Sequence, residues 1–370
     1  MTLSIVKEAA ISRVIEPRKP TRRLRPGPSR VLMVVATAVL LASAILSVTQ
    51  GAVAIPASAI LEMLLSRVPL IGDRLGILAH WPPAQEAVVL QIRLPRVVLA
   101  GMVGASLSVA GATYQGLFRN PLADPYLIGV ASGAGLGGII ALVLPLPAVL
   151  YSLGVVQWMA FAAGLATVGL VYLLARVGRT TPVTTLLLAG VALGSFATSV
   201  TSFLMYMHAD KLHTAYSWLL GGFSLGNWNQ VILILPYGVV GFGAIFVHAR
   251  LLNVMQLDEE QAVQLGIDVE RMKLVLVVAA TLVTAASVSV SGLIGFVGII
   301  VPHAVRLIWG PDYRVLLPMS TLVGALFLLW ADTLARTALA PTEIPVGVVT
   351  AFCGAPFFLY LLRQRKRMVF

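Results

Sequence analysis

Long apolar runs divide this chain into segments that could each cross a bilayer. Short polar or charged stretches separate the runs. A helix needs about 20 mostly apolar residues to cross the hydrocarbon core of a membrane. The pattern therefore predicts an all-α, polytopic membrane protein with about ten transmembrane helices. The predicted spans are residues 31–50, 97–117, 126–145, 149–174, 184–207, 230–247, 274–291, 293–309, 315–334 and 344–362.

Two smaller patterns refine this picture. Glycine recurs at four-residue spacing in the third span and again in the fifth, and such rows let helices approach closely in lipid. The glycines are Gly129, Gly133, Gly137, Gly190 and Gly194. The long outer segment 51–92 contains several prolines, and residues 60–65 within it are predicted to form a short interfacial helix.

Composition supports the membrane class and excludes others. The chain of 370 residues is 58% hydrophobic and only 11% charged, more apolar surface than a soluble domain can bury. A net charge of +11 could suggest nucleic acid, but the cations lie in short clusters between apolar runs, so we exclude nucleic acid as a partner. The single cysteine, Cys353, excludes a disulfide framework or a thiolate cluster within one chain.

Charge asymmetry predicts the orientation. With the amino terminus inside, 20 of the 26 Lys and Arg residues fall on the cytoplasmic side. Membrane proteins keep these residues inside, so both termini are predicted to be cytoplasmic, in a bacterial cytoplasmic (inner) membrane. We divide the chain into a basic disordered tail (1–30), a ten-span domain (31–362) with a cytoplasmic segment at 248–273, and a basic cytoplasmic tail (363–370).

That cytoplasmic segment holds five of the fifteen acidic residues. Asp258 and Gln261 have the spacing of a capping box, and Glu259 and Glu260 suit the positive end of a helix. Gly266 can adopt the left-handed conformation that ends one. A short exposed helix is therefore predicted, either as part of a solvated loop or as a helix that lies in a partner's groove.

The chain carries little that could perform chemistry. Asp332 and Glu343 are the only acidic residues close to a span, and both fall near outer ends, which argues against proton coupling. His303 lies about a whole membrane from Asp332 along this topology, so a paired hydrolytic site is not expected. No Gly-Lys pair occurs, which excludes a phosphate-binding P-loop. If ATP drives this protein, a second polypeptide binds the ATP.

Several stretches, taken in order, resemble the FecCD-type permeases. These are the membrane subunits of ATP-binding-cassette (ABC) importers for ferric siderophores, haem and cobalamin. The stretches are Arg93-Leu-Pro-Arg96, Gln115 with RNPLADP (119–125), GVASGA from Gly129, LLLAG (186–190), GLIGFVGIIVPHAVR (292–306) and EIPVGVVTAFCGAPFF (343–358). The resemblance implies a type II ABC importer permease that forms a homodimer, with two ATPase subunits below and one substrate-binding protein above. It implies no cofactor in this chain, since ATP and Mg²⁺ belong to the ATPase.

The resemblance also assigns roles to residues. Arg93, Arg96 and Arg336 would receive acidic side chains of the binding protein; the alternative is interfacial snorkelling. The stretch 258–266, with Asp258, Glu259, Glu260 and the small residues Ala262 and Gly266, resembles the helix that couples the permease to the ATPase. Thr184 and Thr185 would belong to a cytoplasmic gate that 180–185 matches only loosely.

The fifth span offers a candidate translocation pathway. Ser195, Thr198, Ser199 and Ser202 follow helical spacing and give one hydroxyl stripe, and Met205 lies beyond it. The alternative is that these hydroxyls bond between helices. Asn120 and Asp124 are expected to cap and shape the turn before the third span, and His303 is not assigned as a ligand.

These observations predict a permease subunit that imports a bulky metal chelate or corrinoid, powered by a partner ATPase. Among these cargoes, a ferric siderophore is favoured only by its base rate as a cargo, and haem or cobalamin are the alternatives. A secondary transporter, an intramembrane enzyme and a structural scaffold stay open as other classes. Coupling-ion dependence without ATP hydrolysis would identify the first, and product formation by the purified chain the second.

Overall fold

A computed structural model of the chain describes residues 30–51, 55–67, 80–257 and 259–369. The predicted tail at 1–30 therefore lies outside the described residues, apart from Arg30. Within these ranges every element is helical, except for an isolated bridge between Val177 and Thr180. The prediction of an all-α protein is confirmed.

The described elements follow the chain in this order. They are α2 (Arg30–Thr49), α3 (Ala57–Ser66), α5 (Pro83–Ala87), η1 (Val88–Arg93), α6 (Leu94–Leu117), η2 (Pro125–Ile128), α7 (Val130–Val143), α8 (Ala148–Ser152), α9 (Val155–Ala175), α10 (Val183–Met207), η3 (Ala209–Lys211), α11 (Leu212–Leu219), α12 (Trp228–Val247), α13 (Ala249–Val254), α14 (Glu259–Gln264), α15 (Val269–Ser291), α16 (Val297–Trp309), α17 (Tyr313–Thr337) and α18 (Val346–Val369).

Each of the ten predicted spans coincides with one of these helices. Seven are long and apolar enough to cross a membrane by themselves: α2, the continuous helix from α5 to α6, α9, α10, α12, α15 and α17. The other three spans coincide with α7, α16 and α18, whose apolar parts are shorter. Left-handed residues shorten two of these, because Gly129 (φ 84°) separates η2 from α7 and Phe296 (φ 70°) precedes α16.

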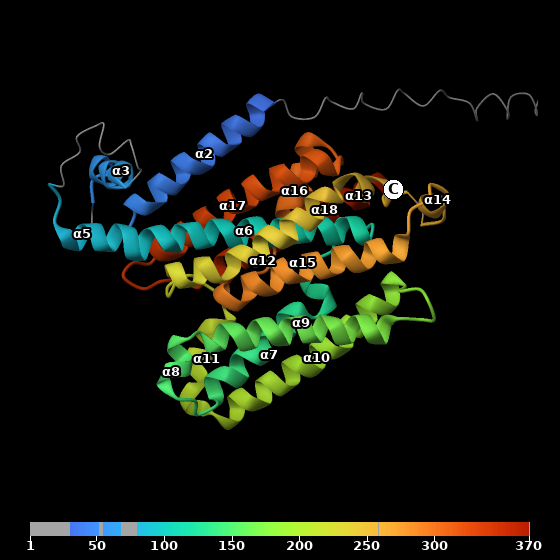
Figure 1. The fold of residues 1–370 in the computed structure, drawn as a ribbon, viewed down its shortest axis with the longest axis horizontal. Coiled ribbons are helices and arrows are strands. Elements are labelled where there is room, and N and C mark those ends of the chain that lie inside the picture. Colours follow the sequence, from blue (N-terminus) through green and yellow to red (C-terminus); the bar gives the residue numbers. More distant parts are fainter. Residues whose placement is uncertain (1–29, 52–54, 68–79, 258, 370) are drawn as a thin grey trace, which may run out of the picture.

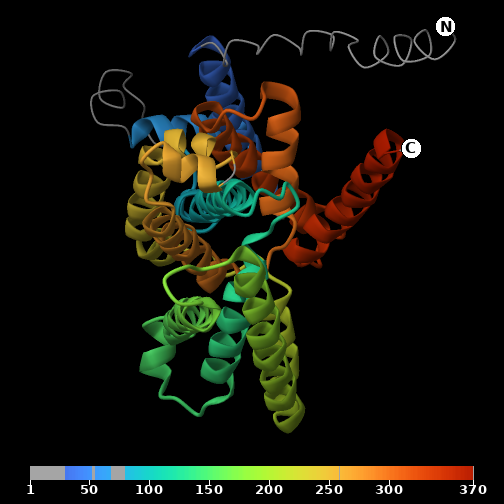
Figure 2. The same cartoon turned by 90° about the vertical axis from the view of Figure 1, so that its right-hand side faces the viewer.

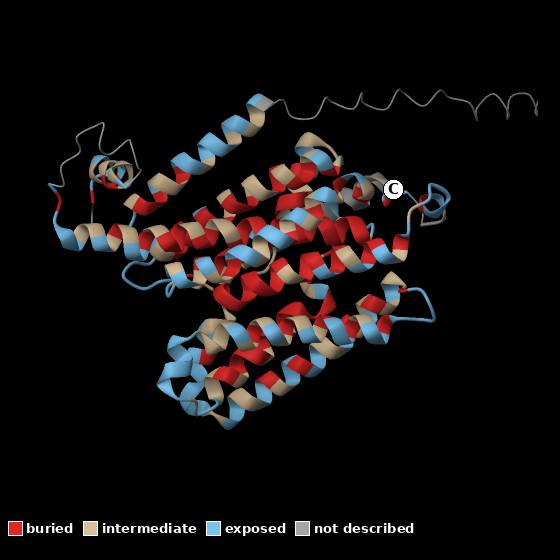
Figure 3. Cartoon of the chain, in the orientation of Figure 1, coloured by how far each residue is buried: buried red, intermediate tan, exposed pale blue. Residues whose placement is uncertain are grey.

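Helix α6 lies at the centre of the molecule. Of its most apolar stretch, 83% of the residues are buried, and α15, α16 and α17 pack around it (Figures 1 and 3). Glycine permits this close packing. A Cβ on Gly111 would overlap the carbonyl of Gly298 on α16, and one on Gly104 would overlap the carbonyl of Gly324 on α17.

Helices α7, α9 and α10 form a second group beside this core (Figures 1 and 2). The glycine rows noted in the sequence lie in its contacts. A Cβ on Gly133 or Gly137 would meet side-chain or backbone atoms of α9, and one on Gly190 would meet the backbone of η2. The rows therefore serve packing, as the sequence predicts.

The connections sort to two ends of the molecule. Figure 1 shows α3, α5, α8 and α11 at one end, and α14 with the loop between α9 and α10 at the other. The loops assigned to the cytoplasmic side thus share an end. We call the end with α14 the cytoplasmic end and the opposite one the outer end, following the predicted orientation.

The structure extends two predicted elements. The predicted interfacial helix at 60–65 is present as α3, and the second span begins at Pro83 rather than at 97, because proline suits the first position of a helix. Helix α18 continues to Val369, so most of the predicted basic tail (363–370) is helical. Figure 2 shows α18 projecting away from the other helices.

Candidate functional site

Arg96 lies in a buried ionic cluster at the outer end. Its Nε donates to both carboxylate oxygens of Asp332 at 3.0 and 3.1 Å, and its Nη2 donates to Asp332 Oδ1 at 2.8 Å. Its Nη1 donates to Glu343 Oε1 at 2.9 Å. The Asp332 side chain is 1% exposed, whereas the Glu343 side chain is 41% exposed. Arg96 therefore joins α6 to α17 and to the loop before α18.

Arg93 and Arg336 bind the end of α2. Arg93 Nη1 donates to the carbonyl of Val48 at 3.0 Å, and Arg336 Nη1 donates to that of Gln50 at 2.8 Å. Arg336 Nη2 donates to the carbonyl and the hydroxyl of Ser47, both at 2.6 Å. The last carbonyls of a helix have no partner within it and attract cations, so the two arginines satisfy and neutralise this helix end.

The three arginines therefore differ from the sequence picture of cations at the bilayer surface. All three are bound within the chain, and the Arg336 side chain is only 6% exposed, so snorkelling into the interface does not describe them. Sequence reasoning missed their partners. The signal was present, because Asp332 and Glu343 were the only carboxylates near spans and lay at the same end as the arginines.

A cavity of about 630 Å³ adjoins this cluster. Arg96 and Glu343 form part of its wall, together with residues from the outer ends of α11, α12 and α15. Apolar side chains such as Leu142, Phe223 and Leu225 form much of the remaining wall, and several side chains that can form hydrogen bonds lie among them. These include Gln157, His213, Thr214, Ser217, Ser224 and Gln230.

The hydroxyl stripe lies on the exposed face of α10. Ser195, Thr198, Ser199 and Ser202 are all exposed, and Met205 is half-buried. Thr198 and Ser199 donate to carbonyls one turn earlier in the same helix, at 2.8 and 2.9 Å. Within the chain, these two hydroxyls therefore bond to their own helix and not to a neighbouring one. The opposite face, with Ala197 and Thr201, is buried.

The candidate gate lies at the cytoplasmic start of the same helix. Thr184 is exposed on the face that carries the hydroxyl stripe, and Thr185 is half-buried. The preceding loop is bound to α15, because the backbone N–H of Thr181 donates to Glu270 Oε2 at 2.9 Å. Glu270 also pairs with Lys273 at 3.1 Å. The gate segment is therefore connected to the helix that follows α14.

The cytoplasmic segment forms two short helices, α13 and α14. Gly266 has a φ of +80° after α14, as expected for a residue that ends a helix. Asp258 lies outside the described residues, as do the side chains of Glu259 and Glu260, so the predicted cap stays a prediction. Ala262, one of the small residues expected in the coupling stretch, is 1% exposed and packs inward. Val263 and Leu265 are exposed instead.

The turn between α6 and α7 has the predicted caps. Asn120 Oδ1 accepts from the N–H of Leu122 at 3.0 Å, and Asp124 Oδ1 accepts from the N–H of Tyr126 at 2.8 Å. Burial raises the pKa of Asp124 to about 6, against the lowering effect of that hydrogen bond.

Asp312, which caps the start of α17, shifts the other way. The hydrogen bonds from Arg314 lower its pKa to about 2.

Motif residues far apart in sequence also meet near the cytoplasmic end. Arg306 Nη1 donates to Gln115 Oε1 at 2.9 Å, and Gln115 Nε2 donates to the carbonyl of Gly298 at 3.1 Å. His303 packs edge-on against Phe357. Among the described residues, no group of three or more His, Cys, Asp or Glu side chains is placed to hold a metal ion. The motifs therefore bind helices to one another here.

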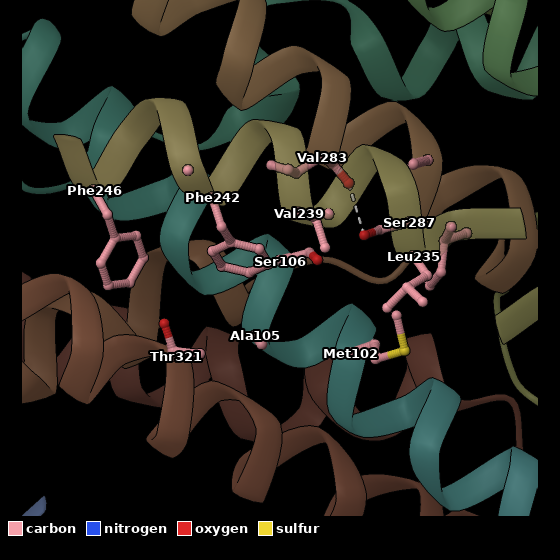
Figure 4. Close-up of a pocket in the computed structure, with 14 residues that line it drawn as sticks. Met102, Ala105, Ser106, Leu235, Val239, Phe242, Phe246, Val283, Ser287 and Thr321 are labelled. Atoms are coloured by element: carbon pink, nitrogen blue, oxygen red, sulfur yellow. Dashed lines mark hydrogen bonds between the residues drawn. The ribbon is translucent and has the colours of Figure 1, made fainter. Parts of the chain in front are cut away.

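A second hollow, of about 430 Å³, lies between α6, α12, α15 and α17. Figure 4 shows that its wall consists mainly of apolar side chains such as Met102, Leu235 and Phe242, while the hydroxyl of Ser287 is engaged by the carbonyl of Val283. None of its lining residues is charged. Its lining therefore offers a cargo apolar contacts and a few hydroxyls but no charged partner.

Known proteins share this sequence and fold. Residues 39–364 match the FecCD transport family. A cobalamin import system permease protein from Halobacterium salinarum is 46% identical over 324 residues, covering 85% of this chain and 86% of that protein. A hemin transport system permease protein from Yersinia pestis is 44% identical, covering 75% and 84%. A solved structure titled as an inward-facing conformation of a putative metal-chelate type ABC transporter matches with a TM-score of 0.78 and 30% identity, covering 91% of this chain and 100% of that one.

Proposed function

The chain belongs to the FecCD transport family and is a permease subunit of an ABC importer, and we propose that it moves a metal chelate across the cytoplasmic membrane. One observation carries the cargo class. The similar proteins named for cobalamin and for hemin, and the structure described as metal-chelate type, share a metal held by an organic ligand.

The exposed face of α10 supports a translocation pathway. Only 17% of the most apolar stretch of α10 is buried within the chain, against 83% for α6. Ser195, Thr198 and Ser202 give this face hydroxyls, and large apolar side chains flank them. We assign the face to a pathway between two copies of the chain, where hydroxyls meet the cargo and apolar side chains meet the second copy.

Substitution on the two faces of α10 tests the pathway. Thr198→Leu with Ser202→Leu should lower uptake severalfold without changing expression, because the pathway becomes narrower and loses hydroxyls. Thr201→Val is the matched control on the buried face, where the hydroxyl bonds only to the carbonyl of Ala197. Equal uptake in the double variant and the wild type would remove α10 from the pathway.

Docking of the ATPase is assigned to α14. Val263 near the end of α14 and Leu265 just after it are 59% and 64% exposed, at the cytoplasmic end of the molecule. Exposed apolar side chains on a short helix suit a groove of another protein. Through α15, Glu270 and Thr181, the segment connects to the start of α10, so movement at α14 has a physical route to the gate.

Docking of the binding protein is assigned to the outer end at Arg96. Of the three arginines predicted for this role, Arg96 has an Nη1 paired with a half-exposed carboxylate and lines the outer cavity. Arg93 and Arg336 are occupied by the end of α2, so we give them the role of holding the docking surface in place.

The cargo within the class is tested directly. Ferric siderophore stays our prediction from sequence, and cobalamin is the second candidate because a cobalamin permease is 46% identical to this chain. The absorption spectrum of ligand that co-purifies with the cognate binding protein separates a corrinoid, a haem and a ferric chelate. A metal-free ligand, or transport by the permease without an ATPase, would contradict the proposal.

Orientation is tested with reporters. Both termini are predicted to be cytoplasmic, so reporter fusions at Ser4 and at Phe370 should both report the cytoplasm. An outside signal at one terminus alone would mean that the number of spans is odd, and outside signals at both would mean that the orientation is inverted. Either result would also place α14 or Arg96 on the side of the membrane opposite to its proposed partner.

A further inference from the structure

We infer that Glu343 is an internal competitor for docking: its carboxylate holds the Nη1 of Arg96 in the free permease, and an acidic side chain of the binding protein replaces it. This inference rests on the proposed docking at Arg96. It adds a residue that limits affinity, and therefore a means of releasing the binding protein after each delivery.

The two carboxylates on Arg96 are not equivalent. Asp332 accepts three hydrogen bonds from Nε and Nη2 and is 1% exposed, so removing it would leave buried charge unpaired. Glu343 accepts one bond from Nη1, at 2.9 Å, and its side chain is 41% exposed. A partly exposed ion pair contributes little net free energy, because water replaces the lost partner. Glu343 is therefore the exchangeable carboxylate.

The backbone around Glu343 allows this exchange. The N–H of Ile344 donates to the carbonyl of Ala335 at 2.9 Å, and the N–H of Val346 donates to the carbonyl of Gly221 at 2.9 Å. The main chain is thus held beside the glutamate and again at the start of α18. The Glu343 side chain can rotate away from Arg96 while these bonds persist, so exchange requires no unfolding of the loop.

The outer cavity supplies the space. Among the residues that line its 630 Å³, Arg96 is the one cation that is charged at every pH of interest, and Glu343 is the one carboxylate. An incoming carboxylate that forms a charge-assisted bond with Nη1 therefore displaces Glu343 and repels it. Gln157, Gln230 and Ser217 line the same cavity and carry hydrogen-bond donors.

The test measures the affinity of the cognate binding protein for the permease–ATPase complex in nanodiscs. Glu343→Gln should tighten binding about fivefold, because the amide competes weakly for Nη1. Asp210→Asn is the matched control, since it removes one exposed negative charge at the outer end and does not line the cavity. It should change affinity by less than about twofold. The melting temperature should be unchanged in both variants.

The outcomes separate the inference from the docking proposal. Glu343→Gln binding that is equal to or weaker than wild type overturns the competition, as does an equal gain in both variants. Docking at Arg96 itself is tested by neutralising the acidic residues on the outer surface of the binding protein. If wild-type permease binds those variants unchanged, the docking proposal fails, whatever Glu343→Gln does.

Discussion

The outer arginines and the surface of α14, both assigned to docking, differ in how far the chain itself occupies them. At the outer end, Arg93, Arg96 and Arg336 bind carboxylates and helix carbonyls of the same chain, and two of them have side chains no more than 11% exposed. At the cytoplasmic end, α14 and the residue after it carry exposed apolar side chains, with Val263 59% and Leu265 64% exposed. The three outer arginines find partners within the chain, whereas α14 leaves apolar surface uncovered.

This difference shows that a residue assigned to docking can first be a structural residue. The outer arginines hold α2, α6, α17 and the loop before α18 together, so their removal would disturb the fold as well as any partner. Substitution of Leu265 would disturb only the surface it exposes. Experiments on the two ends should therefore give different readouts, which the following predictions use.

The largest effect is expected at Asp332. Asp332→Asn leaves the guanidinium of Arg96 buried with only Glu343 as a charged partner, and weakens the pairing of Arg336. Removing one partner of a buried ion pair costs about 3–5 kcal/mol. We expect little folded protein by fluorescence-detected size exclusion. Asp210→Asn is the control and should elute as wild type. Wild-type elution of Asp332→Asn would show that the cluster is not structural.

A large effect on assembly, without loss of fold, is expected at Leu265. Leu265→Arg places a charge where an apolar contact with the ATPase is proposed, so co-purification and uptake should fall at least about tenfold. The melting temperature should stay within about 2 °C of wild type, because the side chain is exposed. Leu265→Met should retain assembly. Substitution at Gly266 is a poorer test, since its φ of +80° strains any side chain.

A moderate effect is expected where α2 meets α17. Ser47 Oγ lies 2.7 Å from Thr333 Oγ1 and accepts from Arg336, and Ser47 is fully buried. Ser47→Ala should lower the free energy of unfolding by about 1–2 kcal/mol, the cost of leaving buried polar groups with fewer partners. Ser152→Ala removes an exposed hydroxyl and should be neutral. Equal melting temperatures for both variants would contradict this role.

The smallest effect concerns pH at the cytoplasmic end. Because the pKa of Asp124 is raised to about 6 from 3.8, the folded protein binds more protons than the unfolded chain between these values. The contribution of Asp124 to the free energy of unfolding is therefore present at pH 4 and is lost as the pH rises to 6 and above. Asp312 has the opposite sign, because its pKa is lowered to about 2. Its contribution is present above pH 4 and is lost below it.

Melting curves between pH 4 and 7 separate the two aspartates. Asp124→Asn keeps the acceptor for the Tyr126 N–H but removes the charge, so its melting temperature should fall less than that of wild type, by about 2 °C, as pH rises. Asp312→Asn should leave this slope unchanged. Parallel curves for wild type and Asp124→Asn would show that the burial of Asp124 has no energetic consequence.

Periodicity predicted the helices well but not their limits. All ten predicted spans are helical, and the glycine rows lie in helix contacts as expected. The helix of the second span begins fourteen residues before the predicted start, because the apolar pattern says little about less apolar turns that extend a helix. The end of α18 was missed for the same reason, since basic residues continue the helix past its apolar part.

The sequence by itself determined the membrane class, the all-helical fold, the positions of the long apolar helices and the family, because hydropathy and ordered motifs are local properties of the chain. Only the tertiary structure decided which residues meet. Arg96 and Asp332 are 236 positions apart, and Arg336 and Ser47 are 289 apart, so no local pattern pairs them. The structure also decided which side chains are buried. Ala262 is buried and Leu265 is exposed, and Glu343 is far more exposed than Asp332, which is why we infer that Glu343 is the exchangeable carboxylate.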